Sequence, residues 1–204
     1  NNEIRLEDFT GKVIHSDLSF NGQFSCSDTL VNQLFSNIRW SMRDNFIDIP
    51  IDCPQRDERL GWTADAQIFA ATACYLADVS TFYSKWLKDL AAEQTPDGNV
   101  QDVVPNVRKG NGASGWGDAA TVIPWVLYHE YDDKVMLETQ YQSMKGWVKY
   151  LKSRAKENYI YPGGRYGDRR RSDGQPGFVD RRIPAGSQTA GQPCLRGNHH
   201  RGRS

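Results

Sequence analysis

Charged residues gather in one short stretch of this sequence, with an apolar run on either side. Fourteen positions contain four carboxylates, two arginines and one tryptophan: Asp52, Arg56, Asp57, Glu58, Arg59, Trp62 and Asp65. Apolar residues dominate 46–51 before the stretch, and a second apolar run begins at Ala66. A solvated helix face would not be flanked in this way. We therefore predict a loop held between buried elements, which is where functional sites tend to lie.

The residue types in this stretch limit its chemistry. It holds no histidine and no Cys/His spacing, which argues against acyl transfer and against a zinc site. Carboxylates beside an arginine and a tryptophan suit a sugar, because acids bind hydroxyl groups and transfer protons while an indole covers the C–H face. Glycoside hydrolysis needs a carboxylic acid of raised pKa to protonate the leaving oxygen. Glu58, beside Asp57 and predicted to lie near Asp52 and Asp65, is the candidate.

An internal ion-pair network is the alternative reading of the same residues. Arg56 and Arg59 could neutralise the acids, and such networks perturb pKa values as catalytic sites do. Cys53 lies inside the stretch, but no histidine stands near it to activate a nucleophile. The four cysteines are far apart without a CxxC pair, which favours buried thiols over disulfides or metal ligands.

The string DCPQRDERLGWTADAQ, from Asp52 to Gln67, resembles the signature of the bacterial α-L-rhamnosidases. These are inverting glycoside hydrolases with an (α/α)6-barrel catalytic domain. Further similarity is found in five other segments: 24–28, 34–40, 77–79, 82–87 and 115–119. The resemblance covers about Gly22 to Asp168 and departs at Ala64, where the family usually has glycine.

The resemblance implies an α-L-rhamnoside as the substrate, hydrolysed with inversion. Glu58 would be the general acid, with Asp52 and Asp65 as further catalytic carboxylates that bind hydroxyls and tune it. Three residues would bind the substrate: Arg56, Trp62 and Trp116, the two indoles as apolar walls. The family's general base is a glutamate in the later half of the barrel, which we do not find here. We therefore expect low or no activity from this chain alone, and the alternative is a non-catalytic rhamnose-binding or assembly fragment.

Helical periodicity predicts the elements that position these groups. Apolar residues recur from Leu30 to Met42 after the good N-caps Ser27 and Asp28, which predicts a buried barrel helix. Pro54 favours a loop over 52–59 that leads into a helix near Leu60 or Gly61. Further helices are predicted over 66–77, from Asp78 or Ser80 to about 91, over 119–131 and from Asp133 onward. The fold class is therefore all-α, part of a helix-hairpin barrel.

Several single positions carry expectations of their own. The long loop 99–117 is predicted to line a site, because loops of this length are uncommon otherwise. Trp125 and Trp147 are expected in the core, and His129 is expected to be a structural histidine.

The sequence divides into three predicted parts. Residues 1–24 are a linker or the end of a preceding β domain, and 25–168 are the first part of the catalytic barrel. Residues 169–204 carry eight arginines against two aspartates, a net charge of +6, and are predicted to be an unstructured tail. The abrupt change after Asp168 suggests a shift of reading frame, since the family commonly continues there with an aromatic residue.

The sequence indicates few partners besides the sugar. No run of about 18 apolar residues exists, so no transmembrane helix is predicted, and the polar start does not resemble a signal peptide. The arginines of the tail lack interleaved aromatic residues, which disfavours nucleic-acid binding. No metal and no organic cofactor is implied by the residues present.

Overall fold

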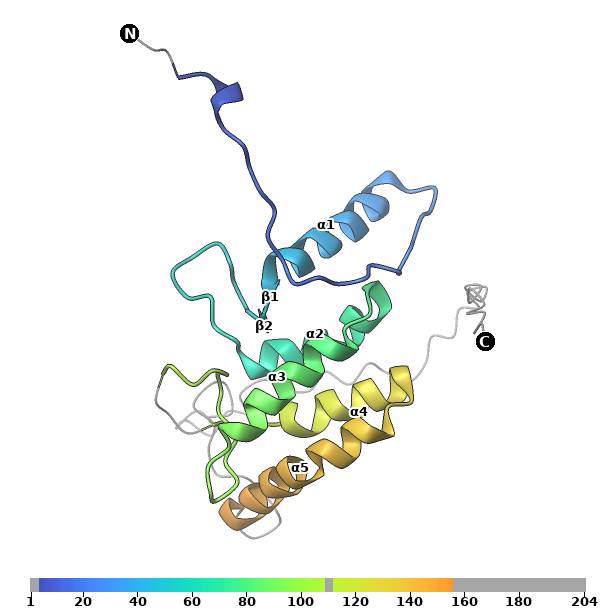
Figure 1. Ribbon diagram of the computed structural model, residues 1–204. Coiled ribbons are helices and arrows are strands. Elements are labelled where there is room, and N and C mark those ends of the chain that lie inside the picture. Colours follow the sequence, from blue (N-terminus) through green and yellow to red (C-terminus); the bar gives the residue numbers. More distant parts are fainter. Residues whose placement is uncertain (1–3, 109–111, 156–204) are drawn as a thin grey trace, which may run out of the picture. The chain divides into compact units, whose positions relative to one another are not determined.

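The computed structural model describes residues 4–108 and 112–155. This part of the chain is all-α, as predicted, and Figure 1 shows its helices. They are α1 (Thr29–Asn45), α2 (Thr63–Leu76), α3 (Ser80–Ala92), α4 (Ala119–Tyr131) and α5 (Lys134–Arg154), with a 3-10 helix at Leu6–Asp8. The predicted tail 169–204 and the suspected frame shift at Asp168 lie outside the described residues. None of the helices described here is long and apolar enough to cross a membrane.

The helix boundaries follow local chemical signals. Asp28 caps α1, where its Oδ1 accepts from the Leu30 backbone nitrogen at 2.8 Å. Asp133 caps α5 in the same way, and its Oδ1 accepts from the Met136 nitrogen at 2.9 Å. Asp132, at φ 54°, makes the left-handed turn that joins α4 to α5 as a helical hairpin. Asp28 was one of the two N-caps predicted for α1, the other being Ser27, and Asp133 was the predicted start of α5.

A short strand pair between α1 and α2 was not predicted. Strand β1 (Phe46–Ile47) pairs antiparallel with β2 (Ile49–Pro50), and Asp48 turns the chain between them at φ 64°. Residues 11–24 form no strand and contribute only an isolated bridge, from Ser19 to Asp78. Apart from this bridge, residues 11–24 have no regular secondary structure.

The core lies among α2, α3, α4 and α5, which pack on one another. Its largest fully buried side chains include Trp86, Trp147 and Tyr83. Each buried indole also bonds a loop: Trp86 Nε1 donates to the Val104 carbonyl at 3.1 Å, and Trp147 Nε1 donates to Asp118 Oδ1 at 2.8 Å. Buried tryptophans need such partners, so the core helices fix the loops that carry the site.

The predicted burial of α1 is wrong in the described structure. Leu30 is 79% exposed and Leu34 57%, and Met42 is the one buried residue of this helix. Periodicity identifies the apolar face of a helix, but burial depends on a partner element, and the described residues leave the N-terminal half of α1 uncovered.

Three other placements also differ from expectation. Trp125 is 57% exposed, because Ile123 and Leu127 turn the opposite side of α4 inward. His129 is exposed and lies beside Glu130, so it has no structural role in the core. Cys26 is exposed, whereas Cys53 is buried and Cys74 partly buried. Trp147 is buried as predicted.

Replacing Gly117 by alanine is expected to destabilise the fold. A Cβ at this position would lie 2.5 Å from Cη2 of the buried Trp147 ring, which cannot move without disturbing the core. We expect the free energy of unfolding to fall by about 1–3 kcal/mol, measured by urea denaturation. Gly11→Ala is the matched control, since no atom lies within 4 Å of its added Cβ. Equal stability of the two variants would contradict the packing described.

Candidate active site

The charged stretch forms a closed loop between β2 and α2. Asp52 closes it at the base: its backbone nitrogen donates to the Leu60 carbonyl at 3.1 Å, and its Oδ1 accepts from the Leu60 nitrogen at 3.3 Å. Arg59 takes a left-handed conformation at φ 54° inside the loop. The helix that follows begins at Thr63, two to three residues later than predicted. The two ends of the loop are thus tied together, which limits how far its charged groups can spread.

A second segment holds the end of this loop in place. Thr63 N donates to the Asp102 carbonyl and Val104 N donates to the Gly61 carbonyl, both at 2.9 Å. A side chain at Gly61 would overlap the Val104 carbonyl oxygen, so only glycine allows this approach. The long loop 99–117 therefore contacts the charged stretch, as its predicted role requires.

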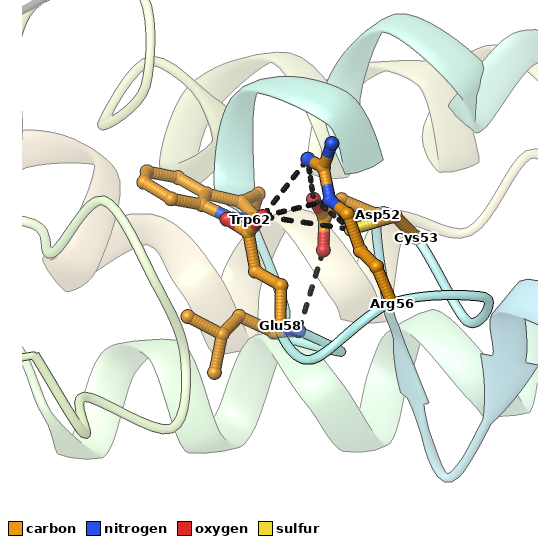
Figure 2. A network of polar contacts seen from close by, with 6 residues as sticks. Asp52, Cys53, Arg56, Glu58 and Trp62 are labelled. Carbon is orange, nitrogen blue, oxygen red and sulfur yellow. Dashed lines mark hydrogen bonds and ion pairs between the residues drawn. The ribbon is translucent and has the colours of Figure 1, made fainter.

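Arg56 lies at the centre of the charged network shown in Figure 2. Its Nη2 is 2.8 Å from Glu58 Oε2 and 3.8 Å from Asp52 Oδ2, and its Nε also donates to Glu58 Oε2 at 3.1 Å. The other Glu58 oxygen, Oε1, accepts from Trp62 Nε1 at 2.9 Å. Both oxygens of the candidate acid are therefore held by donors from its own loop and from the residue before α2.

Cys53 completes this network, although the sequence assigned it no role. Its Sγ donates to Asp52 Oδ2 at 2.8 Å and accepts from Arg56 Nε at 3.0 Å. Burial and the hydrogen bond to Asp52 raise the pKa of the thiol, so it stays protonated and is a poor nucleophile. In the sequence, only the position of Cys53 between Asp52 and Arg56 pointed to a place in this network.

Three potential metal ligands meet in the same place. Oxygen and sulfur atoms of Asp52, Cys53 and Glu58 lie within 4.8 Å of one another. The Arg56 guanidinium contacts all three, and the thiol is held as a hydrogen-bond donor, not as a thiolate. The positive charge that the two carboxylates attract is therefore already supplied by Arg56. Asp52, Cys53 and Glu58 do not fit a metal ion.

Trp62 lies beside the candidate acid. It is 8% exposed, its ring nitrogen bonds Glu58, and the guanidinium of Arg108 lies 5.0 Å from its ring centroid. Arg108, from the long loop, was missed by the sequence analysis because the contact joins residues far apart in the chain. In this arrangement Trp62 links the acid to the loop.

A cavity of about 520 Å³ adjoins the network between α1, the strand pair and α2. Asp52, Asp65 and Trp116 line it together with apolar side chains that include Met42, Phe46, Ile51 and Phe69. Arg56, Glu58 and Trp62 are not among its lining residues. The six predicted site residues therefore form two adjoining groups, and Asp52 belongs to both.

Trp116 is positioned by the turn that carries it. Gly115, at φ 84°, donates its backbone N–H to Asp118 Oδ2 at 3.0 Å, and its carbonyl accepts from Gln67 Nε2. Gln67 lies on α2, so the helix that carries Asp65 also holds the turn before Trp116. The carboxylate and the indole are thereby brought to the same cavity.

Asp65 is the carboxyl group whose environment disfavours its charge. It lies in the first turn of α2 and is partly buried. Burial raises its pKa, and the nearby charges of Asp52 and Glu58 raise it further. A proton therefore binds more tightly to Asp65 in the folded chain than in the unfolded one.

Asp65→Asn is expected to raise stability at neutral pH. The pKa of Asp65 is higher in the folded chain than in the unfolded one. The stabilisation that comes from its protonated carboxyl group is therefore fully present below the ordinary aspartate pKa and is lost as the pH rises through the pKa of the folded state. The melting temperature of the variant should exceed that of the unmodified chain at pH 7, and the gap should close near pH 3. Asp57→Asn is the control, since the Asp57 side chain is fully exposed. A gap that does not change with pH would contradict the burial of this charge.

Comparison with known proteins identifies the family. Residues 19–184 match the bacterial alpha-L-rhamnosidase 6 hairpin glycosidase domain. The chain is 51% identical over 147 residues to an alpha-L-rhamnosidase of Alteromonas sp., covering 72% of this chain and 16% of that protein. It is 43% identical over 160 residues to one of Streptomyces avermitilis, covering 78% of this chain and 15% of that protein.

Solved structures agree. The crystal structure of Streptomyces avermitilis alpha-L-rhamnosidase complexed with L-rhamnose aligns with a TM-score of 0.70 at 44% identity, over 72% of this chain and 14% of that one. The alpha-L-rhamnosidase from Dictyoglumus thermophilum aligns with a TM-score of 0.78 at 41% identity, over 82% and 19%. This chain thus spans about a sixth of the length of these relatives. The chain belongs to the bacterial α-L-rhamnosidase family and contains part of its six-hairpin glycosidase domain.

Proposed function

We propose that this chain carries the acid side of a rhamnoside-hydrolysing site, with Glu58 as the general acid. The observation that supports it most is the closeness of Glu58 to Asp52 in the network of Figure 2, where their oxygen atoms lie within 4.8 Å of one another and Asp52 also lines the adjoining cavity. The network adjoins a cavity lined by two more of the predicted site residues, Asp65 and Trp116, which favours a site over an ion-pair network of purely structural role.

In this proposal the cavity receives the rhamnosyl group. Asp52 and Asp65 would accept hydrogen bonds from its hydroxyls, and Trp116 with Met42 and Phe69 would contact its C–H surface and its methyl group. The relative from Streptomyces avermitilis was crystallised with L-rhamnose, which supports the same sugar as the ligand here.

Proton transfer requires one oxygen of Glu58 to face the glycosidic oxygen. Trp62 is buried and its indole is fixed, whereas the Arg56 side chain is 63% exposed. Arg56 is therefore the partner that can move when a substrate enters, which would leave Oε2 free to take up a proton from solvent and then pass it to the leaving glycosidic oxygen. Catalytic hydrogen bonds often reach their working geometry only when the substrate is bound.

The second half of the reaction is assigned to another part of the domain. Inversion needs a carboxylate base roughly 6.5–9.5 Å from the acid, with a water molecule between them. Asp52 and Asp65 are given sugar-binding roles here, so we assign the base to a part of the domain outside this chain, which spans about a sixth of the length of its relatives. The 204-residue chain by itself is then expected to bind rhamnose without efficient turnover, which is also what a rhamnose-binding or assembly fragment would do.

Binding of L-rhamnose to this chain is expected to be saturable and to depend on Trp116. Trp116→Ala should weaken it by about fivefold or more, because an aromatic face against a sugar is lost. The exposed Trp125 lies on α4 outside the cavity lining, so Trp125→Ala is the control. The measurement is an NMR titration with L-rhamnose and, in parallel, L-fucose. Equal response to the two sugars, or none, would sink the proposed substrate class.

Glu58→Gln is expected to remove the acid while keeping the shape of the site. In a polypeptide with the whole catalytic domain, turnover of a rhamnoside with a poor leaving group should fall by about 10²–10⁴-fold. The loss should be smaller for an aryl rhamnoside, whose leaving group needs less protonation. Asp57→Asn, a neighbouring and fully exposed carboxylate, is the control. If turnover of the poor substrate stayed unchanged in Glu58→Gln, the acid would have to be another residue.

A further inference from the structure

The thiol of Cys53 lies where the contacts of the site converge. It is 6% exposed, it donates to Asp52 Oδ2 at 2.8 Å and it accepts from Arg56 Nε at 3.0 Å. Its sulfur also lies 3.6 Å from Glu58 Oε2. None of the roles proposed for the site residues involves this thiol.

Arg56 needs such a partner, because its side chain is largely exposed and packing does not fix it. Its guanidinium is held by polar contacts to Asp52, Cys53 and Glu58. Of these three groups, Cys53 is the most buried, and it is anchored in turn on Asp52. Asp52 is itself fixed by the Leu60 backbone, so the chain of contacts ends on the base of the loop.

We infer that Cys53 is a positioning residue. Its buried thiol is anchored on Asp52, holds the Arg56 guanidinium in place and so determines where Arg56 contacts Glu58; we call this chain of contacts the thiol relay. The inference rests on the proposed function for its meaning in catalysis. Its geometric content, that Arg56 is held by the thiol, stands on the contacts alone.

A thiol suits this relay because it both donates and accepts. The raised pKa of Cys53 keeps its proton in place for the bond to Asp52. A hydroxyl has the same two capacities with a shorter reach, and a methyl group has neither. Serine should therefore restore much of what alanine removes.

The test uses Cys53→Ala and Cys53→Ser in the full 204-residue chain. The readouts are the NMR resonances of Arg56 Nε–H and Trp62 Nε1–H, with Arg56→Lys to identify the former. Cys74→Ala is the matched control, since it removes a partly buried thiol outside the network. L-Rhamnose affinity is measured on the same samples.

In Cys53→Ala we expect the Arg56 Nε–H resonance to move to the position of a free arginine and the Trp62 resonance to shift with it. Serine should recover most of both shifts, and Cys74→Ala should change neither. We expect rhamnose affinity to fall by about fivefold in the alanine variant, the loss of roughly one hydrogen bond. An Arg56 resonance that stays in place in Cys53→Ala would overturn the inference.

The serine variant decides the question if the alanine variant does not fold. An Arg56 resonance near its original position in Cys53→Ser supports the relay, and one at the free position overturns it. Failure of the unmodified chain to bind L-rhamnose is a separate result. It would sink the proposed function, while the resonances would still show whether the thiol holds Arg56.

Discussion

The backbone pairing of residues 61–63 with 102–104 is the constraint on which the rest of the site depends. The Val104 carbonyl accepts from the core residue Trp86, and the Val104 nitrogen donates to Gly61. Trp62, the residue after Gly61, bonds the carboxylate of Glu58. A helix of the core is thus connected to the candidate acid through one loop and one glycine. Because each step is a hydrogen bond of 2.9–3.1 Å between buried or partly buried groups, the acid inherits the rigidity of the core.

The site also concentrates charge at a cost to the fold. Arg56 is shared between Glu58 and Asp52, while Asp65 is partly buried with both of these carboxylates near it. Stability alone would favour a second cation or a neutral side chain at position 65. Sequences keep such unfavourable groups where function requires them, which fits a role for Asp65 in binding a polar ligand.

The sequence predicted what local patterns determine. The bounds of α4, the caps Asp28 and Asp133 and the loop after Pro54 depend on residues next to one another, and the structure confirms them. The exposure of α1 and of Trp125 depends on which elements pack together. Helical periodicity in the sequence does not reveal this. The thiol relay and the contact of Arg108 with Trp62 arise from the fold of the loops and had no signal in the pattern. The charged stretch was found because its chemistry is local, and its roles in a reaction stay a prediction.

The two carboxylate oxygens of Asp118 connect the core to the turn beside the cavity. Its Oδ1 accepts from Trp147 of α5, and its Oδ2 accepts from the backbone of Gly115, just before Trp116. The indole that lines the cavity is therefore set by a helix 29 residues further along the chain, which contributes no residue to the lining. Evolution can in this way widen or narrow the cavity by repacking α5 while every residue that touches the ligand stays the same. Differences in ligand preference among relatives then need not be visible in their cavity residues.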